Sequence, residues 1–330
     1  MEQSSHVGVR ASLMASLFAL TLVAQQPSQP AKSATGASPA LQRPMTQLKP
    51  IHTIRTGADP DWMVVTTNAV WVTTSHNNRV SEINAISNRV GHTITVNKPC
   101  SGLAAGFGSL WIPSCGDHTL VRASLTTGRM QKIINVGPAN SEGGITAGAG
   151  SIWLATNSSG ILSRIDPRTG AVIASITIPS GSFCPLFADG FVWVTSTEHS
   201  VLTKVDPATN TVVAEIPVGK NPRFLTSGAG SIWTLNQGDG TISRVDSKSD
   251  RLVASIPAGI SGAGGEIAFG FGSVWATLEK FPITRIDARN NRVVRQWTGA
   301  GGDSIRAGHG SIWLTNLESG IVWRINPATL

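Results

Sequence analysis

A tryptophan recurs seven times at nearly constant intervals, and this repeat constrains the fold more than any other feature of the chain. Successive members are 38 to 42 residues apart: Trp71, Trp111, Trp153, Trp193, Trp233, Trp275 and Trp313. Between them the apolar stretches are four to six residues long, and Gly, Asn, Asp or Ser separates one from the next. Short apolar runs divided by turn residues are typical of β-strands joined by hairpins. Each repeat therefore predicts four strands.

A short polar residue follows each of these tryptophans by twelve or thirteen positions. The series is Asn84, Ser124, Asp166, Asp206, Asp246, Asp287 and Asn326. Such side chains accept hydrogen bonds from the backbone two or three residues later and so begin a turn. Because the position recurs in every repeat, we interpret these residues as structural and not as catalytic.

A basic residue stands two positions before this turn in six of the seven repeats. These residues are Arg122, Arg164, Lys204, Arg244, Arg285 and Arg324. We expect their aliphatic stems to pack along the sheets and their charged ends to lie in water. The net charge of +7 is then spread around the molecule, which weakens the case for one nucleic-acid-binding patch.

The two ends of the chain complete one repeat between them. The last repeat reaches Asn326 where its fourth strand should begin, and residues 52–60 align without a gap with residues 214–222, which contain the fourth strand of a complete repeat. We therefore predict an all-β fold over residues 50–330. It is a seven-bladed β-propeller with four-stranded blades, and the N-terminal strand closes its last blade.

The residues before the repeats are of a different character. Residues 11–24 form an apolar run (ASLMASLFALTLVA) that is short for a bilayer span and ends in small residues, as in a secretory signal. We expect residues 1–24 to be a signal peptide and residues 25–49, rich in Pro, Ser, Ala and Gln, to be a flexible linker. The mature protein would then be secreted or periplasmic, with no stable membrane insertion. An uncleaved anchor is the alternative.

The three cysteines fall at one end of the predicted blades. Cys100 starts the second blade and Cys115 ends the neighbouring strand at the same face, so an exported protein could join them in a disulfide. Closing this loop of 15 residues would contribute about 3 kcal/mol in the chain-entropy model. Zinc held by Cys100, Cys115 and His118 is the alternative, although a fourth ligand is lacking. We expect Cys184 to be a free buried thiol.

The repeat resembles two related groups of propellers. Residues 192–195 (VWVT) and 201–219 (VLTKVDPATNTVVAEIPVG) are similar to the YVTN repeat of YncE-like and surface-layer propellers. Residues 310–316 (GSIWLTN) and 324–326 (RIN) are similar to the virginiamycin B, or streptogramin B, lyase family. Both resemblances imply a propeller fold over about residues 50–330, and propellers of one fold host many unrelated functions.

The lyase resemblance also implies an activity, the metal-assisted opening of a cyclic depsipeptide. It implies a His eleven residues before a blade tryptophan and a Glu three residues after it. The residues eleven before are Pro60, Cys100, Glu142, Ser182, Pro222, Gly264 and Gly302, and those three after are Thr74, Ser114, Thr156, Ser196, Asn236, Leu278 and Asn316. Because neither residue is matched, the catalytic pair is not carried over. Whether the chain is an enzyme stays open, and its catalytic residues and cofactors stay unassigned.

Residues that break the repeat at the start of the inner strands are the candidates for ligand binding. They are Asp61, Trp62, Glu142, Arg223, Glu266, Asp303 and Arg306. The register equivalents of Arg306 in the other repeats are uncharged, so we expect Arg306 to enter the central channel. No metal site is predicted, because acids on separate blades need not converge on one point.

These observations leave three hypotheses about function. The first is an exported monomer that binds a small molecule, a peptide or a protein at the loop-rich mouth of the central channel. The second is a metal-assisted lyase or hydrolase that acts on a cyclic ester or depsipeptide through Glu142, Glu266 or Asp303. The third, which we do not favour, is the binding of nucleic acid or an acidic polymer.

Overall fold

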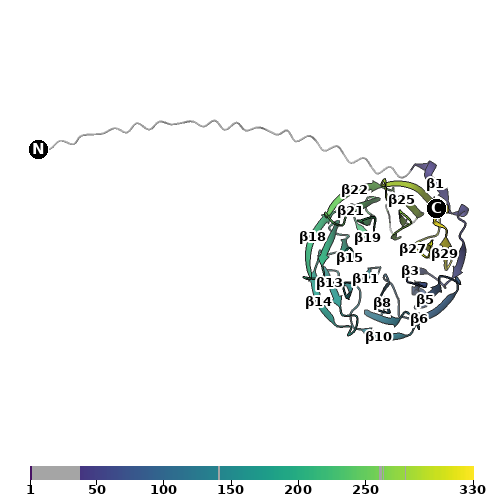
Figure 1. Ribbon diagram of the computed structural model, residues 1–330, viewed down its shortest axis with the longest axis horizontal. Coiled ribbons are helices and arrows are strands. Elements are labelled where there is room, and N and C mark those ends of the chain that lie inside the picture. The colour runs from purple at the N-terminus through teal and green to yellow at the C-terminus, as the bar shows by residue number, and fades with distance from the viewer. Residues whose placement is uncertain (2–37, 140–141, 260–261, 263, 279) are drawn as a thin grey trace. The chain divides into compact units, whose positions relative to one another are not determined.

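The computed structural model describes Met1 and residues 38–330, apart from residues 140–141, 260–261, 263 and 279. Residues 38–330 form a ring of seven sheets (Figure 1). The predicted signal peptide, except for Met1, and residues 25–37 of the predicted linker lie outside the described residues. Within the described part of the chain, no helix is long and apolar enough to cross a membrane.

Each sheet contains a blade of four antiparallel strands, so the predicted propeller is confirmed. From the inner to the outer strand, blade 1 contains β3 (Pro60–Val65), β4 (Ala69–Thr74), β5 (Arg79–Asn84) and β6 (Val90–Thr95), and blade 2 contains β7 (Ala104–Gly106), β8 (Ser109–Ser114), β9 (Thr119–Ser124) and β10 (Met130–Ile134). In the same order, blade 3 contains β11 (Ile145–Gly148), β12 (Ser151–Asn157), β13 (Ile161–Ile165) and β14 (Val172–Thr177), blade 4 contains β15 (Ser182–Ala188), β16 (Phe191–Ser196), β17 (Val201–Asp206) and β18 (Thr211–Pro217), and blade 5 contains β19 (Pro222–Gly228), β20 (Ser231–Asn236), β21 (Thr241–Asp246) and β22 (Arg251–Pro257). Blade 6 contains β23 (Ile267–Gly270), β24 (Ser273–Leu278), β25 (Phe281–Asp287) and β26 (Arg292–Thr298), and blade 7 contains β27 (Ile305–Gly308), β28 (Ser311–Asn316), β29 (Ile321–Ile325) and β2 (His52–Arg55).

The N-terminal strand closes the ring as predicted. Strand β2 pairs antiparallel with β29, so that His52 lies opposite Arg324 and Ile54 lies opposite Val322. The Ile51 N–H extends the ladder by donating to the Arg324 carbonyl oxygen at 2.7 Å. The side chain of Ile54 is buried against Met63 of blade 1, so the closing strand also joins blade 7 to blade 1.

Blade 6 has a fifth strand that the sequence did not predict. Strand β1 (Gln42–Pro44), between the 3-10 helices η1 (Pro39–Leu41) and η2 (Met45–Gln47), pairs parallel with the outer strand β26. Met45 and Leu48 pack against the apolar cluster shared by blades 6 and 7. Residues 38–48 therefore differ from the flexible linker that their composition predicts, because these two apolar side chains cover the blade edge.

The recurring tryptophans hold neighbouring blades together. All seven side chains are fully buried. In six of them the indole Nε1–H donates, at 2.9–3.2 Å, to the carbonyl oxygen of the residue five positions earlier, which ends the inner strand. Each of these six rings therefore combines a large buried apolar area with a satisfied polar group, as burial of an indole requires.

The recurring Asp, Asn and Ser residues begin turns, as predicted. Asp166 is representative: its Oδ1 accepts hydrogen bonds from the backbone N–H groups of Arg168 at 2.7 Å and Thr169 at 2.8 Å. In blade 6, hydrogen bonds from the side chain and backbone of Arg289 lower the pKa of Asp287 to about 2. These carboxylates stay ionised and serve the backbone.

Five of the six recurring basic residues bridge neighbouring blades, so for these five the prediction that the charged ends lie in water is wrong. The guanidinium of Arg164 stacks over Trp153, 5.0 Å from its ring centre. Its Nη1 then donates to the Pro207 carbonyl oxygen at 2.6 Å and to Asn210 Oδ1 at 2.8 Å, both in the turn of the next blade. The same reach to the next turn occurs in Arg122, Lys204, Arg244 and Arg324. An arginine or lysine side chain that extends across the tryptophan ring is long enough to reach the turn of the next blade.

We expect Arg164→Met to lower the free energy of unfolding by about 1–3 kcal/mol, because the variant loses charge-assisted bonds and leaves a carbonyl without its donor. Urea unfolding followed by circular dichroism measures the change. Arg168→Met is the matched control, since Arg168 is exposed in the turn of the same blade and should change stability by less than about 0.5 kcal/mol. Equal losses in the two variants would show that the bridge between blades contributes nothing.

Candidate functional site

Two hollows meet at the centre of the ring, at the face where the inner strands begin. The channel has a volume of about 310 Å³, and its lining includes Val64, Ala104, Thr146, Leu186, Thr226, Ala268 and Arg306. The mouth pocket, of about 370 Å³, is lined by Asp59, Asp61, Trp62, Ser75, Lys98, Cys100, Glu142, Phe224, Gly264, Gly265, Asp303 and Leu317. Because Trp62 and Phe224 line both hollows, they form the floor of the mouth pocket and the roof of the channel.

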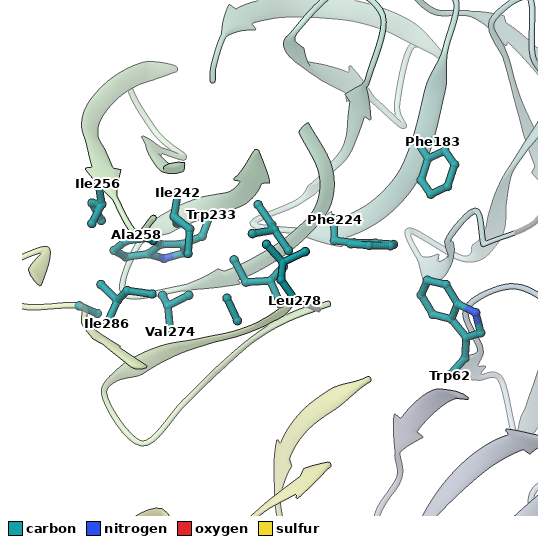
Figure 2. Packing of buried hydrophobic residues seen from close by; sticks show 14 residues of the cluster. Trp62, Phe183, Phe224, Trp233, Ile242, Ile256, Ala258, Val274, Leu278 and Ile286 are labelled. Atoms are coloured by element: carbon teal, nitrogen blue, oxygen red, sulfur yellow. The ribbon is translucent and has the colours of Figure 1, made fainter. Parts of the chain in front are cut away.

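An aromatic cluster from three blades makes this floor (Figure 2). Trp62 of blade 1 meets Phe224 of blade 5 edge to face, with ring centres 5.5 Å apart, and Phe224 meets Phe183 of blade 4 in the same way at 6.0 Å. Trp62 is 4% exposed, and its Nε1–H has no hydrogen-bond partner among the described residues. Figure 2 shows the nitrogen-bearing edge of Trp62 turned away from Phe224.

An ion pair crosses the mouth above the aromatic cluster. Arg223, at the start of β19, donates to the carboxylate of Glu142, which precedes β11. The guanidinium lies over Phe183 and Phe224, at 4.7 Å and 5.4 Å from the ring centres. Arg223 thus neutralises Glu142 and covers the aromatic faces at the same time.

A second ion pair lies lower, at the wall of the channel. Glu266 is 5% exposed, and its carboxylate accepts from the Ser304 hydroxyl, from the Ile305 N–H at 3.3 Å and from the Arg306 guanidinium. Burial raises the pKa of Glu266, and the charge of Arg306 opposes that rise. Arg306 lines the channel, where its register equivalents are uncharged.

The two remaining acids both line the mouth pocket. Asp61 lies on the inner strand of blade 1 and Asp303 precedes that of blade 7, and Asp303 Oδ1 accepts from the Gly265 N–H at 2.7 Å. Burial raises the pKa of Asp61 well above its usual range, and the nearby charges of Asp303, Glu266 and Glu142 raise it further. These effects favour the protonated form of Asp61.

Six of the seven predicted ligand-binding residues line the mouth pocket or the channel, and the seventh, Arg223, is bonded to Glu142 at the mouth. Four of the seven form two ion pairs, Glu142 with Arg223 and Glu266 with Arg306. Our sequence reasoning missed Phe224. The sequence could have indicated this residue, because Phe224 precedes Trp233 by nine residues, just as Trp62 precedes Trp71.

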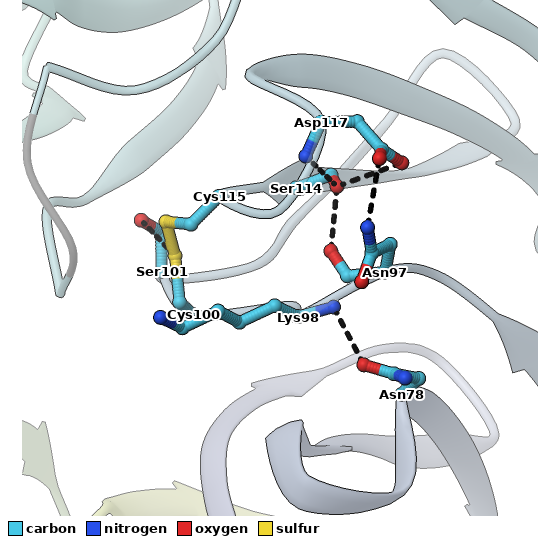
Figure 3. The surroundings of a disulfide bond; sticks show 8 residues. All are labelled: Asn78, Asn97, Lys98, Cys100, Ser101, Ser114, Cys115 and Asp117. Carbon is cyan, nitrogen blue, oxygen red and sulfur yellow. Dashed lines mark hydrogen bonds between the residues drawn. A yellow bond between two sulfur atoms is a disulfide. The ribbon is translucent and has the colours of Figure 1, made fainter.

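The cysteine pair supports one wall of the mouth pocket (Figure 3). Cys100 and Cys115 form a disulfide with their Cα atoms 5.9 Å apart. The two sulfur atoms bond each other, which leaves no thiolate for the alternative zinc site. The Lys98 N–H, two residues before Cys100, donates to Asn78 Oδ1 at 2.8 Å and so ties this wall to blade 1.

Cys184 is a free thiol on β15 and lines the channel. It is half-buried, which makes it less enclosed than the sequence analysis expects. Burial, with a smaller effect of the Glu266 charge, raises its pKa to about 12. A thiol that stays protonated at neutral pH is a poor nucleophile.

Metal binding has little support from the side-chain geometry. Among the described residues, no group of three or more His, Cys, Asp or Glu side chains is arranged to hold a metal ion. Glu142 and Glu266 are each held by an arginine. The mouth pocket therefore presents the carboxyl groups of Asp61 and Asp303, an indole N–H that lacks a partner among the described residues, and the Glu142–Arg223 ion pair at its edge.

These features define a seven-bladed β-propeller whose irregular residues gather at one end of the channel. Among solved structures it is similar to a streptogramin B lyase, with a TM-score of 0.70 and 18% identity over 83% of this chain and 96% of that one. It is also similar to the selenomethionine-substituted virginiamycin B lyase from Staphylococcus aureus, with a TM-score of 0.69 and 19% identity over 83% of this chain and 98% of that one. The fold is that of a virginiamycin B lyase-like propeller. No protein-family model matches the sequence, and no curated protein is significantly similar to it.

Proposed function

We propose that the protein binds a small ligand in the mouth pocket. The observation that carries this proposal is the convergence of non-repeating residues on one hollow of about 370 Å³ with an aromatic floor. A concave site with an apolar base and a few directed polar groups is the usual form of a ligand pocket. Residues that served only the propeller would recur from blade to blade, as the buried tryptophans do.

The charge of the pocket indicates what the ligand carries. Its lining includes four acidic residues, Asp59, Asp61, Glu142 and Asp303, and one basic residue, Lys98. Arg223 neutralises Glu142 and burial raises the pKa of Asp61, which leaves Asp59 and Asp303 as the acids that neither an arginine nor burial offsets. An acidic wall attracts a positively charged group or several hydrogen-bond donors. The aromatic floor accommodates an apolar part of the same ligand. A small molecule or the end of a peptide with both properties fits this description.

A thermal-shift screen with cationic amines, short basic peptides, neutral sugars and cyclic depsipeptides tests the proposal. We expect a member of the first two groups to raise the unfolding midpoint of the protein. Glu142→Gln should weaken that cationic ligand by about tenfold, because the substitution leaves the charge of Arg223 without its partner at the mouth. Glu215→Gln, an exposed position on the outer strand β18, should leave the affinity unchanged. Equal affinity in the wild type and in Glu142→Gln would place the ligand elsewhere.

Export of the protein forms a separate part of the proposal. Its support is the apolar run at residues 11–24 and the disulfide between Cys100 and Cys115, since disulfides persist outside the cytoplasm. We expect protein recovered from outside the cytoplasm to begin near Gln25. N-terminal sequencing that finds an intact Met1 in that fraction would contradict cleavage.

A metal-assisted lyase or hydrolase is the second candidate, favoured by the similarity of the fold to streptogramin B lyase. Mass spectrometry of virginiamycin B incubated with the protein, with and without Mg²⁺, tests it. We expect no turnover, because the His and Glu implied by the resemblance are absent from the corresponding positions. In addition, Glu142 and Glu266 are each bonded to an arginine. Ring opening that depends on Mg²⁺ would favour the lyase or hydrolase over the binding function.

A further inference from the structure

We propose that the face of the ring opposite the mouth docks on an anionic membrane surface. This turn face consists of the turns that join the first strand to the second and the third strand to the fourth in the blades, whereas the mouth lies at the other end of the strands. Docking there goes beyond ligand binding and does not depend on it, because the mouth pocket and the turn face share no residue. The contact is peripheral, and no part of the propeller spans the bilayer.

Exposed apolar side chains gather on the turn face. Three of them stand at turn tips: Ile86 is 84% exposed, Phe271 46% and Phe107 44%. Others lie at or next to the adjoining ends of the outer strands, namely Ile51, Val90, Met130, Val172 and Leu252. Among the described residues, none of the exposed large apolar side chains lies in the loops around the mouth. The two faces of the ring therefore offer different surfaces to a partner.

The two phenylalanines occupy positions that turn geometry disfavours. Phe107 and Phe271 have φ of 55° and 54°, and a glycine with positive φ follows each. This left-handed region suits Gly, Asn and Asp, whereas a bulky side chain adopts it at a cost. At the corresponding turns, four other blades have Ala149, Asp189, Ala229 and His309. Because an exposed aromatic ring at such a position stabilises neither the turn nor the core, we attribute both rings to contact with a partner.

The apolar tips lie along one continuous arc of the ring. They come from blades 6, 7, 1 and 2 in turn, at Phe271, Ile51, Ile86 and Phe107. These blades are consecutive because the ring closes between blades 7 and 1 (Figure 1). Side chains that project from four separate blades suit a flat, deformable surface, which can contact all of them at once.

The same arc is basic. Exposed arginines accompany the apolar tips on blades 1, 2 and 6, namely Arg89, Arg129, Arg289 and Arg292. Of the acidic side chains at this end of the arc, Asp287 is bonded to Arg289 at 2.8 Å, and Glu82 lies 3.9 Å from His92 Nε2. The other aspartates of the turn face are on blades 3 to 5, at Asp166, Asp189, Asp206, Asp246 and Asp250. Anionic headgroups attract such arginines while the apolar tips enter the interface.

The N-terminal segment leads to the same arc. Strand β1 pairs parallel with β26, with Gln42 opposite Gln296 and Pro44 opposite Thr298. Because β26 runs from the turn at residues 287–291 towards the mouth, the described residues before β1 lie towards the turn face, at the outer rim of blade 6 (Figure 1). An anchor retained at residues 11–24 would thus join the propeller beside the turn face. Docking there points the mouth pocket away from the lipid, where a dissolved ligand can enter it.

Vesicle co-sedimentation tests the docking with the full chain. The vesicles consist of phosphatidylcholine alone, or of phosphatidylcholine with roughly a third phosphatidylglycerol, which supplies the negative surface. We expect the wild type to bind the anionic vesicles and to leave the neutral vesicles mostly unbound. The binding should weaken as sodium chloride is added, because salt screens the attraction between arginine and phosphate.

Removal of the apolar tips should weaken binding to the anionic vesicles by at least about tenfold, because these side chains no longer leave water in the interface. The variant combines Phe107→Asn, Phe271→Asn and Ile86→Ser. Asparagine is favoured in left-handed turns, so the unfolding midpoint should not fall. Val213→Thr is the matched control, since Val213 is 50% exposed on the outer strand of blade 4, outside the arc. It should keep the wild-type affinity.

Removal of two charges tests the basic part of the arc. Arg89→Gln combined with Arg129→Gln should weaken binding by about 25-fold, since each basic side chain near an anionic surface contributes about fivefold. Lys220→Gln, at an exposed position on the mouth side, should have no effect. Hydrogen exchange adds the orientation: vesicles should protect the amides of residues 86–89 and 107–109 and leave those of residues 237–240, at the mouth, unchanged.

Three results would overturn docking on lipid. Wild-type affinity in the variant without apolar tips would assign vesicle binding to residues outside the turn face, including the apolar run at residues 11–24. Heparin binding that requires Arg89 and Arg129, without binding to vesicles, would make an acidic polymer the partner. Protection of the mouth loops by vesicles would reverse the orientation. None of these results changes the thermal-shift screen for mouth ligands, so the proposed function stands or fails separately.

Discussion

A chain that begins at Ala58 is expected to lose at least about 10 °C from its unfolding midpoint, which corresponds to about 3 kcal/mol or more for a protein of this size. This truncation removes β2, the strand that completes blade 7. Ile54, Met63 and Val322 belong to one buried cluster, so the loss of Ile54 bares its apolar neighbours to water. Differential scanning calorimetry measures the midpoint.

The exposed edge of β29 gives a second readout. Once β2 is absent, an unpaired strand edge is available to another molecule, and such edges promote association. We expect the truncated chain to form concentration-dependent oligomers in analytical ultracentrifugation, and a synthetic peptide of residues 49–57 to restore the monomer.

The control is a chain that begins at Lys49, which keeps β2 and, of the described elements, loses only η1, β1 and η2. It should stay a monomer, with a midpoint within about 5 °C of the full chain, because β1 covers an edge that four antiparallel strands already support. If both truncated chains had the same unfolding midpoint, β2 would not be the element that stabilises the closed ring.

The fold could be predicted because the same residue types form the same turns and strands in every blade. Every repeat needs a turn after its third strand, and a short polar side chain such as Asp166 supplies it. The missing strand of blade 7 was visible because residues 52–60 match residues 214–222, where a complete blade ends. Strand β1 has no counterpart in the other repeats, so a search for periodicity could not find it.

Several residues that line the two hollows could be predicted, but their contacts could not. Each candidate is an exception to the repeat, and sequence alone shows exceptions. Contacts depend on which blades face each other: Arg223 reaches Glu142 across the mouth, whereas Asp61 and Asp303 line the same pocket only because the ring closes between blades 7 and 1. The reach of Arg164 to the next blade was misjudged for the same reason, since its partners lie 43 and 46 residues away.

Trp233→Ala is the point substitution from which we expect the largest loss of stability. An indole of this kind buries about 150–250 Å², which at about 25 cal/mol per Å² sets an upper limit of about 4–6 kcal/mol. Because Trp233 is fully buried in the cluster between blades 5 and 6, the structure cannot collapse into the space left behind. We expect a loss of about 3–5 kcal/mol in urea unfolding.

Two further variants test how much of the stability depends on the indole N–H and on the depth of burial. Trp233→Phe keeps most of the apolar area but removes the Nε1–H that donates to the Gly228 carbonyl oxygen at 3.0 Å, so it should cost about 1–3 kcal/mol. Trp323→Ala, at a half-buried position on β29, should cost less than half as much as Trp233→Ala, because less of its surface leaves water on folding. A loss near zero for Trp233→Ala would mean that the repeated tryptophans do not hold the blades together. The seven-fold spacing in the sequence would then need another physical cause.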